Sequence, residues 1–314
     1  MSDNKLEYGY LNNITVRTKV LNFIRQIFFI KSLENWLVSK TKDKTHGGFY
    51  SKLVPNHYQY PKNTERIATR NGVRYHFDLS DLVDWWTYYG FEDKSKTELY
   101  ASISDGSIVM DIGANMGDVS FNLARIIGNK GHVISFEPDR SNYERFERNL
   151  ALNNFSNITL VKNGLGREFG SFTMAINENE PGNDGSKRIL KTSNNSKNLE
   201  LVKIITLDSW VEKNPIEQLD LVKIDVEGYE VKALKGGENT LVKYGPDLYM
   251  EVHDAKLKEQ GSSAKELLFF IQGLGYSIQL DHTNSKLDVD GNLNDIHIDV
   301  VCKIINKETN HGDA

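Results

Sequence analysis

Two pairs of titratable side chains stand where predicted strands end, and they could carry acid–base chemistry. The apolar run 219–226 predicts a buried strand, with Asp225 and Glu227 at its carboxyl end. A second buried strand, predicted further along the chain, ends in Glu251 and His253. Because an imidazole titrates near neutral pH, His253 is the first candidate for a general base and Asp225 is the second. The structural alternatives are an acid that caps the next helix and a histidine that belongs to the core.

Oxygen and nitrogen donors at these two strand ends would also suit a divalent cation. The donors would come from Asp225, Glu227, Glu251 and His253. Their spacing does not require a metal, however, and we expect none.

A glycine-containing loop between a predicted strand and a predicted helix is the strongest indication of a cofactor. Asp111 ends the strand, and Gly113 and Gly117 remove side chains where the backbone must turn tightly and approach a ligand. The spacing resembles the dinucleotide fingerprint, but Asn115 replaces its second glycine and Gly117 comes one residue before its third. Since that second glycine lets a pyrophosphate approach the helix, Asn115 favours a smaller nucleoside without pyrophosphate.

The next predicted strand ends in an acid that could bind ribose. Glu137 lies 24 residues after Gly113, near the distance at which an acidic residue binds ribose hydroxyls. A carboxylate can accept two hydrogen bonds from a vicinal diol. Strand, loop, helix, strand and acid therefore follow one another in the order expected for a nucleotide-like cofactor.

Several longer segments resemble the FkbM family of class I methyltransferases. They are VMDIGANMG (109–117), FEP (136–138), TLDSW (206–210), LVKIDVEGYE (221–230), LKGG (234–237) and MEVH (250–253). The resemblance covers about residues 100–255, roughly half of the chain, and KIDVEG is its most specific element. Family members commonly carry alanine where Gly164 stands, so the loop Asn163-Gly164 departs from the family pattern.

The resemblance implies methyl transfer from S-adenosylmethionine to oxygen, frequently a hydroxyl of a sugar, a surface polysaccharide or a natural product. Methyl transfer from a sulfonium is an in-line displacement, in which positioning supplies most of the catalysis. For the acceptor we expect contacts from Glu251 and from Asn183 and Ser186 in the polar stretch 177–198, which could close over the site. The expected catalytic residues are His253, Asp225 and Glu227. The expected cofactor residues are Asp111, Gly113, Asn115, Gly117, Glu137, Asn163 and Asp225.

Regular alternation of strands and helices from about residue 104 must position these side chains. It predicts a doubly wound, Rossmann-like α/β fold, with the seven-stranded sheet that class I methyltransferases have. We expect this domain over 101–306, an N-terminal extension over 1–100 and a polar tail over 307–314. The expected strands are 107–112, 132–136, 158–162, 169–176, 199–205, 219–226, 248–252, 276–280 and 296–304, and the expected helices are 118–127, 141–152, 231–241 and 263–274.

The N-terminal extension carries three signals of its own. Apolar residues at helical spacing over 20–38, mixed with lysine and arginine, predict an amphipathic helix. Such a helix can lie on a membrane, but more often it covers a core or a partner, and two copies of the chain could associate through it. Asn71-Gly72 predicts a tight turn within a hairpin over 67–79, and the aromatic-rich segment 84–100 is expected to be helical.

Composition narrows the classes of function. The net charge is −5 and the pI about 5.9, so the basic excess of a general nucleic-acid binder is missing. The single cysteine, Cys302, permits no intrachain disulfide and sits in an apolar run expected to be core. We find no apolar run long enough to span a bilayer and no signal-peptide pattern at the start, and we therefore expect a cytoplasmic protein.

Two other functions fit the same residues. A nicotinamide-dependent oxidoreductase could use this topology, but Asn115 and the lack of a recognisable hydride-transfer constellation disfavour it. A catalytically silent protein could keep the fold and bind a partner through its N-terminal region. The acceptor itself is expected to be a small molecule or glycan, including nucleotide-linked sugars.

Overall fold

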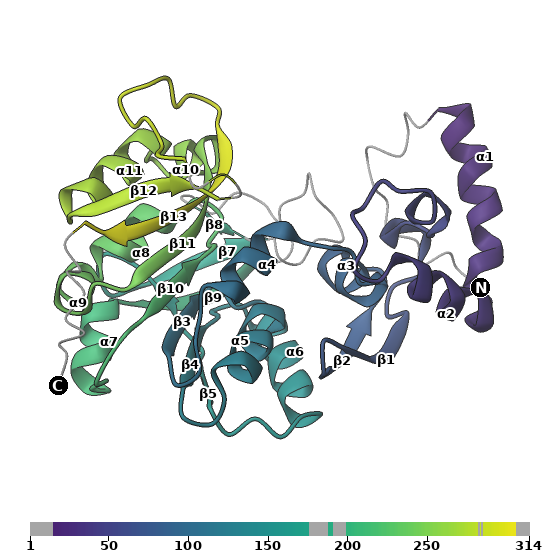
Figure 1. Cartoon of the computed structure of the whole chain (residues 1–314), viewed down its shortest axis with the longest axis horizontal. Helices are drawn as coiled ribbons and strands as arrows, with labels where there is room; N and C mark the ends of the chain where they lie inside the picture. The colour runs from purple at the N-terminus through teal and green to yellow at the C-terminus, as the bar shows by residue number, and fades with distance from the viewer. Residues whose placement is uncertain (1–14, 176–187, 191–198, 282, 284, 306–314) are drawn as a thin grey trace, which may run out of the picture. The chain divides into compact units, whose positions relative to one another are not determined.

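The computed structural model describes residues 15–175, 188–190, 199–281, 283 and 285–305 (Figure 1). The chain divides into two compact units. Of the described residues, 15–94 and Arg145–Asn154 form the first, which we call the N-terminal unit. The second, which we call the sheet unit, contains Ser95–Glu144, Phe155–Ala175 and the described residues from Arg188 onwards.

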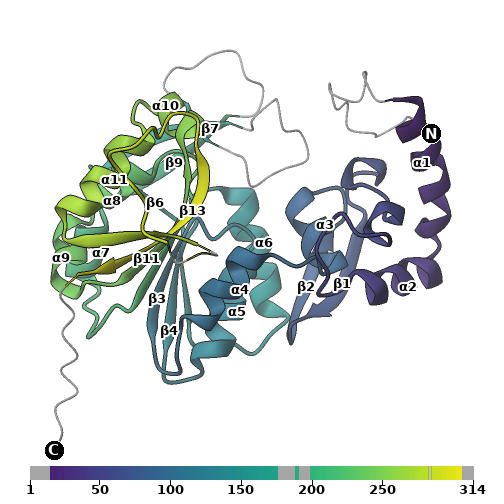
Figure 2. The ribbon, with the colours of Figure 1, turned by 45° about the horizontal axis from the view of Figure 1, so that its top comes forward.

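The sheet unit is built on the predicted seven-stranded sheet, whose order is β12-β13-β11-β10-β3-β4-β5 (Figures 1 and 2). Neighbouring strands from β11 to β5 are parallel, and β13 runs antiparallel to β11 and β12 on either side of it. The predicted doubly wound, Rossmann-like fold of the class I methyltransferase type is confirmed. The strands are β3 (Ile108–Ile112), β4 (His132–Phe136), β5 (Ile158–Val161), β10 (Leu221–Ile224), β11 (Asp247–His253), β12 (Tyr276–Leu280) and β13 (His297–Ile304).

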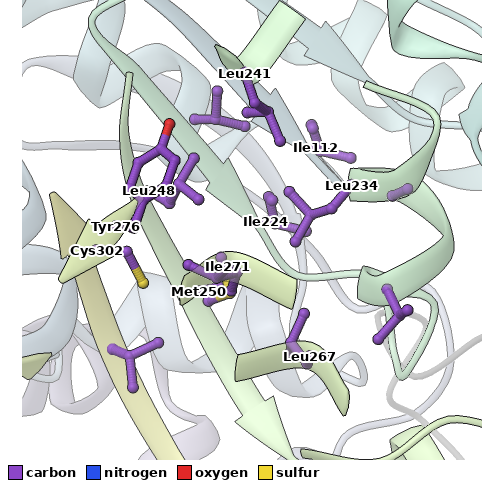
Figure 3. Close-up of a cluster of buried hydrophobic side chains, with 14 of the residues drawn as sticks. Ile112, Ile224, Leu234, Leu241, Leu248, Met250, Leu267, Ile271, Tyr276 and Cys302 are labelled. Atoms are coloured by element: carbon purple, nitrogen blue, oxygen red, sulfur yellow. The ribbon is translucent and has the colours of Figure 1, made fainter. Parts of the chain in front are cut away.

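Helices cover both faces of this sheet, as a parallel sheet requires. On one face, Leu99 of α4 (Lys94–Ala101) and Leu123 of α5 (Asp118–Ile127) pack with Val109 of β3. On the other face, α7 (Leu207–Lys213), α8 (Glu230–Lys235), α9 (Glu238–Tyr244) and α11 (Ala264–Gly273) contribute to a larger core (Figure 3). That core includes the predicted buried Cys302. Two further helices are α6 (Arg140–Ala151) and α10 (Asp254–Glu259).

The prediction of one helix over 231–241 is wrong, because the chain forms α8 and α9 with a break at Gly236-Gly237. A Cβ at Gly236 would lie 1.9 Å from the carbonyl oxygen of Gly166. Close packing of two backbones therefore fixes the break, and helical periodicity alone could not show it.

A smaller four-stranded sheet, ordered β6-β9-β7-β8, follows β5 in the chain. Its strands are β6 (Gly164–Leu165), β7 (Gly170–Ala175), β8 (Arg188–Leu190) and β9 (Leu199–Ile205). The sequence predicted β7 and β9 but neither β6 nor β8, which are too short to show a periodic pattern.

The N-terminal unit contains the predicted hairpin of β1 (Glu65–Arg70) and β2 (Val73–Asp78). Asn71 and Gly72 both have positive φ, +48° and +80°, as the tight turn requires. The single helix predicted over 20–38 is wrong: α1 (Val16–Arg25), a 3₁₀ turn η2 (Gln26–Phe29) and α2 (Lys31–Thr41) replace it.

The single helix expected over 84–100 is also wrong, since α3 (Leu82–Tyr89) ends at Gly90 in the left-handed conformation. Two 3₁₀ turns, η3 (Ser51–Leu53) and η4 (His57–Gln59), complete the unit. Among the described residues of the chain, no helix has the length and apolar character needed to cross a membrane.

Candidate active site

The strand order reverses between β3 and β10, and the predicted cofactor loop lies at the carboxyl end of β3. Gly113 has φ +85°, and a Cβ there would lie 1.9 Å from the carbonyl oxygen of Asp225. The amides of Gly113 and Ala114 both donate to the carbonyl oxygen of Phe136, over 3.0 and 3.1 Å. Gly117, at φ +94°, begins α5. Gly113 is thus required by the close approach of the segments that follow β3 and β10, whatever binds above it.

Glu137, which follows β4, contacts the loop at Asn115. The Asn115 amide donates to Oε2 of Glu137 over 2.8 Å, and the Asp139 amide donates to Oε1 over 2.9 Å. Burial raises the pKa of the Glu137 carboxyl to about 7, although the two amide hydrogen bonds oppose the shift. The buried Oδ1 of Asn115 has no hydrogen-bond partner in the structure. Unused acceptor capacity therefore remains at this loop, which fits a ligand that donates hydrogen bonds.

Asp111 lies beneath the loop, fully buried. Its Oδ2 accepts a 2.6 Å hydrogen bond from Ser120, and its Oδ1 is 3.3 Å from the ammonium nitrogen of Lys223. Lys223 also donates to the carbonyl oxygen of Gly113 over 3.2 Å. Burial lowers the pKa of Lys223, but the charges of Asp111 and Asp225 outweigh it and raise that pKa above its ordinary value. Asp111 therefore supports the loop through Lys223, and its direct contact with a cofactor stays a prediction.

Asp225 and Glu227 follow β10 at the same edge. The strand ends at Ile224, so Glu227 is not placed by strand alternation; it sits in a loop with φ +55°. Its Oε2 is 2.8 Å from the ammonium nitrogen of Lys256. Burial raises the pKa of Glu227 to about 7, the ion pair with Lys256 opposes this, and the Asp225 charge adds to it. Asp225 is itself about half exposed, with a side-chain accessibility of 45%.

Glu251 and His253, at the end of β11, meet a residue that the sequence analysis missed. The antiparallel register places His297 of β13 opposite His253, and the two rings stack with centroids 4.4 Å apart and planes 7° apart. Oε1 of Glu251 is 2.5 Å from Nε2 of His297, and its Oε2 accepts a 3.3 Å hydrogen bond from Lys256. His297 starts an apolar run, but only the pairing of β11 with β13 reveals its partners.

Glu251, His253 and His297 are also the described residues that could hold a metal ion. Each offers one ligand atom, and these atoms lie within 4.8 Å of one another. Two imidazole nitrogens and one carboxylate oxygen would suit a divalent transition metal. The expectation of a metal-free site stays a prediction.

Of the remaining predicted residues, one follows β5 and two lie outside the described residues. Asn163 follows β5 and is half-buried. At the neighbouring Gly164, where the family commonly has alanine, Cδ1 of Ile204 lies 2.5 Å from the position of a Cβ, so Ile204 fills that space. Asn183 and Ser186 lie outside the described residues.

The segment TLDSW (206–210) has a structural role in this chain. Oδ1 of Asp208 accepts hydrogen bonds from the backbone amide and the hydroxyl of Thr240, over 2.8 and 2.7 Å, near the start of α9. These hydrogen bonds therefore link α7 to α9.

Comparison with known proteins matches this chain to one protein family. Residues 111–278 match the methyltransferase FkbM domain. A protein named methyltransferase 1, from Beauveria bassiana, is 25% identical over 58% of this chain and 76% of its own length. The hexuronic acid methyltransferase AglP of Haloferax volcanii is 27% identical over 56% of this chain and 69% of its own. The crystal structure of an FkbM methyltransferase from Methylobacillus flagellatus matches 67% of this chain and 48% of that one, with 20% identity and a TM-score of 0.44.

Proposed function

The chain belongs to the methyltransferase FkbM domain family, and from that premise we propose that it transfers a methyl group from S-adenosylmethionine to a hydroxyl oxygen. The observation that carries the proposal is the position of the loop 113–117. It lies where the strand order reverses, between an acid suited to ribose and the titratable side chains after β10 and β11.

The loop suits a nucleoside of this kind. The two oxygens of Glu137 accept hydrogen bonds from the backbone amides of Asn115 and Asp139, and a carboxylate has about four acceptor sites, so it can also accept from ribose hydroxyls. Asn115 supplies a further acceptor and crowds the space that a pyrophosphate would need. Asn163, after the next strand, would contact the base, and the half-exposed Asp225 would hold the ammonium group of the methionine part.

When bound, S-adenosylmethionine supplies an electrophilic methyl group, and the residues of this chain position the acceptor and handle its proton. We assign the general base to His253, which lies at the edge beside Asp225 and Glu227. Glu251 has both oxygens engaged by His297 and Lys256, so it fixes the cluster around His253. Asp225 is the second candidate for the base, because it is exposed and carries no short ion pair.

The acceptor that we propose is a hydroxyl of a sugar or glycan, nucleotide-linked sugars included. The relative from Haloferax volcanii is named for its action on a hexuronic acid, which is a sugar acid, and this supports the proposal. Glu251 and, from the polar stretch before β9, Asn183 and Ser186 would contact the acceptor.

A labelled-methyl transfer assay tests the proposal. The protein is incubated with methyl-labelled S-adenosylmethionine and a panel of nucleotide sugars and glycans, and mass spectrometry identifies the product. We expect transfer by the wild type and a fall of about 10²–10⁴-fold in turnover for His253→Gln, the range that a general base supplies. His132→Gln, a change in β4 away from this edge, is the matched control and should retain activity.

Three results would overturn the proposal in different ways. Failure to bind S-adenosylmethionine removes the cofactor assignment. An NADH fluorescence titration that saturates would favour an oxidoreductase instead. Cofactor binding without turnover on the whole panel, with partner binding unchanged in His253→Gln, would favour a catalytically silent protein.

A further inference from the structure

The exposed apolar side chains of the chain are concentrated at its N-terminal unit. Ten of the sixteen exposed large hydrophobic residues in the described part of the chain lie between residues 16 and 50. We call these ten the apolar surface: Val16, Val20, Phe23, Ile24, Ile27, Phe29, Ile30, Trp36, Phe49 and Tyr50. Scattered exposed hydrophobics need no explanation, whereas a concentration of this kind marks a binding surface.

Helix α1 is oriented with its apolar side outwards. Val16, Val20, Phe23 and Ile24 of α1 and Ile27 of η2 recur at helical spacing and form one stripe, and Phe23 is 75% exposed. The less exposed side of the helix consists of Thr18, Leu21, Asn22 and Arg25, and three of these four residues are polar. A helix that served only to cover a core would bury its apolar stripe, so this stripe has another partner.

Hydrogen bonds hold α1 in this orientation. Nε of Arg25, a buried residue, donates to the carbonyl oxygen of Lys52 over 2.9 Å. Gln59 donates from its side chain to the carbonyl oxygen of Asn22, over 2.9 Å. The outward position of the stripe is therefore fixed by specific contacts on the other side of the helix.

Aromatic rings extend the apolar surface beyond α1. The ring of Phe28 stacks on Trp36 with centroids 6.3 Å apart. Trp36 meets Tyr50 edge to face at 5.7 Å, and Tyr50 meets Phe49 at 5.4 Å. Phe49 is 72% exposed. The rings form a continuous chain, and aromatic rings of this kind favour the interface between lipid and water.

Within residues 15–56, the segment that contains the apolar surface, positive charges outnumber negative ones. Residues 15–56 contain eight lysines and arginines against two acids, in a protein whose net charge is −5. One of the acids, Glu34, is fully buried and paired with Arg66 and Lys31. At about 100° per residue, the exposed Arg17 and Lys19 flank the stripe on its two sides.

We propose that the apolar surface and its basic rim bind the surface of an anionic lipid bilayer. An apolar stripe flanked by cations is the arrangement of interfacial helices that lie in the plane of a membrane. A second copy of this chain would bring two positive rims together, and the like charges oppose that contact. The proposal concerns residues of the N-terminal unit alone and does not depend on the cofactor or the acceptor.

Vesicle flotation with the full chain tests the proposal. The anionic vesicles contain phosphatidylcholine with about 30% phosphatidylglycerol, and vesicles of phosphatidylcholine alone are the reference. We expect the protein to float with the anionic vesicles, and less so in high salt. Phe23→Ser with Ile27→Ser should lower the partition coefficient at least about tenfold. Removing one charge, as in Lys19→Gln, should lower it about fivefold.

Matched controls separate binding from folding. Val242→Ser removes an apolar side chain of the sheet unit that is 63% exposed, and it should leave flotation unchanged. All variants should keep the circular dichroism spectrum of the wild type, because the substituted side chains face solvent. Absence of flotation, equal flotation with both kinds of vesicle, or an equal loss in Val242→Ser would overturn the proposal. So would a dimer in solution that Phe23→Ser dissociates without any flotation, because that result identifies a second copy as the partner.

Discussion

The ion pair between Lys223 and Asp111 can be tested by removing one partner and then both. Asp111 is fully buried, Lys223 is 8% exposed, and their charged atoms are 3.3 Å apart. Lys223→Met keeps the length of the side chain but removes the positive charge beside the Asp111 carboxylate, which keeps its hydrogen bond from Ser120. Breaking a buried pair on one side costs about 3–5 kcal/mol, because an uncompensated charge stays in the interior. We expect a loss of this size in the free energy of unfolding.

The double variant Asp111→Asn/Lys223→Met removes both charges, so we expect it to recover at least about half of that loss. Urea unfolding followed by circular dichroism measures both values, and hydrogen exchange in β3 and β10 shows whether the loss lies in the sheet unit. Lys235→Met is the matched control. It breaks the 2.8 Å ion pair between Lys235 and Glu266, whose side chains are 30% and 43% exposed, respectively. The free energy of unfolding should fall by no more than about 1 kcal/mol. If Lys223→Met costs as little as Lys235→Met, or if the double variant is no more stable than Lys223→Met, the reasoning is refuted.

Three further changes follow from the same site. Because the pKa of the Glu137 carboxyl is raised from 4.5 to about 7, the folded state holds its proton more tightly than the unfolded chain does. Wild-type stability should therefore fall between about pH 4.5 and 7 relative to Glu137→Gln, by at most about 3 kcal/mol, and a pH series of urea melts of both proteins measures the difference. A difference that is constant over this range would contradict it. Gly113→Ala places a Cβ 1.9 Å from the carbonyl oxygen of Asp225, so we expect the sheet unit to be strongly destabilised, and unchanged melting would contradict the geometry. Treatment with a chelator should leave methyl transfer unchanged if His253 acts as a base without a metal ion; loss of activity that zinc restores would instead make His253 and His297 metal ligands.

Much of the fold follows from local sequence, because its strongest elements carry their own signals. The structure has α5 at Asp118–Ile127 and β4 at His132–Phe136, the limits that periodicity and flanking residues predict. Predictions failed where packing between distant segments decides. Gly236 breaks a helix because it lies against Gly166.

The site was predicted in part for a similar reason. In a parallel sheet the strand ends share one edge, so Asp225 and His253 could be assigned to it from the order of strands alone. His297 could not, because it arrives from the antiparallel strand β13, whose neighbour the sequence does not identify. The burial of individual side chains could not be predicted from the sequence either. The sequence did not indicate that the Asp111 carboxylate is fully buried beside Lys223, and its contact with the cofactor stays a prediction.

Calorimetric titration with S-adenosylhomocysteine tests the central claim most directly, since it needs no acceptor. We predict saturable binding with one site per chain, weakened about tenfold or more in Glu137→Gln, because a charge-assisted hydrogen bond contributes about 1.5–3 kcal/mol. Glu144→Gln, at a side chain that is 50% exposed, should bind like the wild type. No heat of binding in the folded wild type, or equal affinity in Glu137→Gln, would contradict the assignment of the loop 113–117 as the cofactor site.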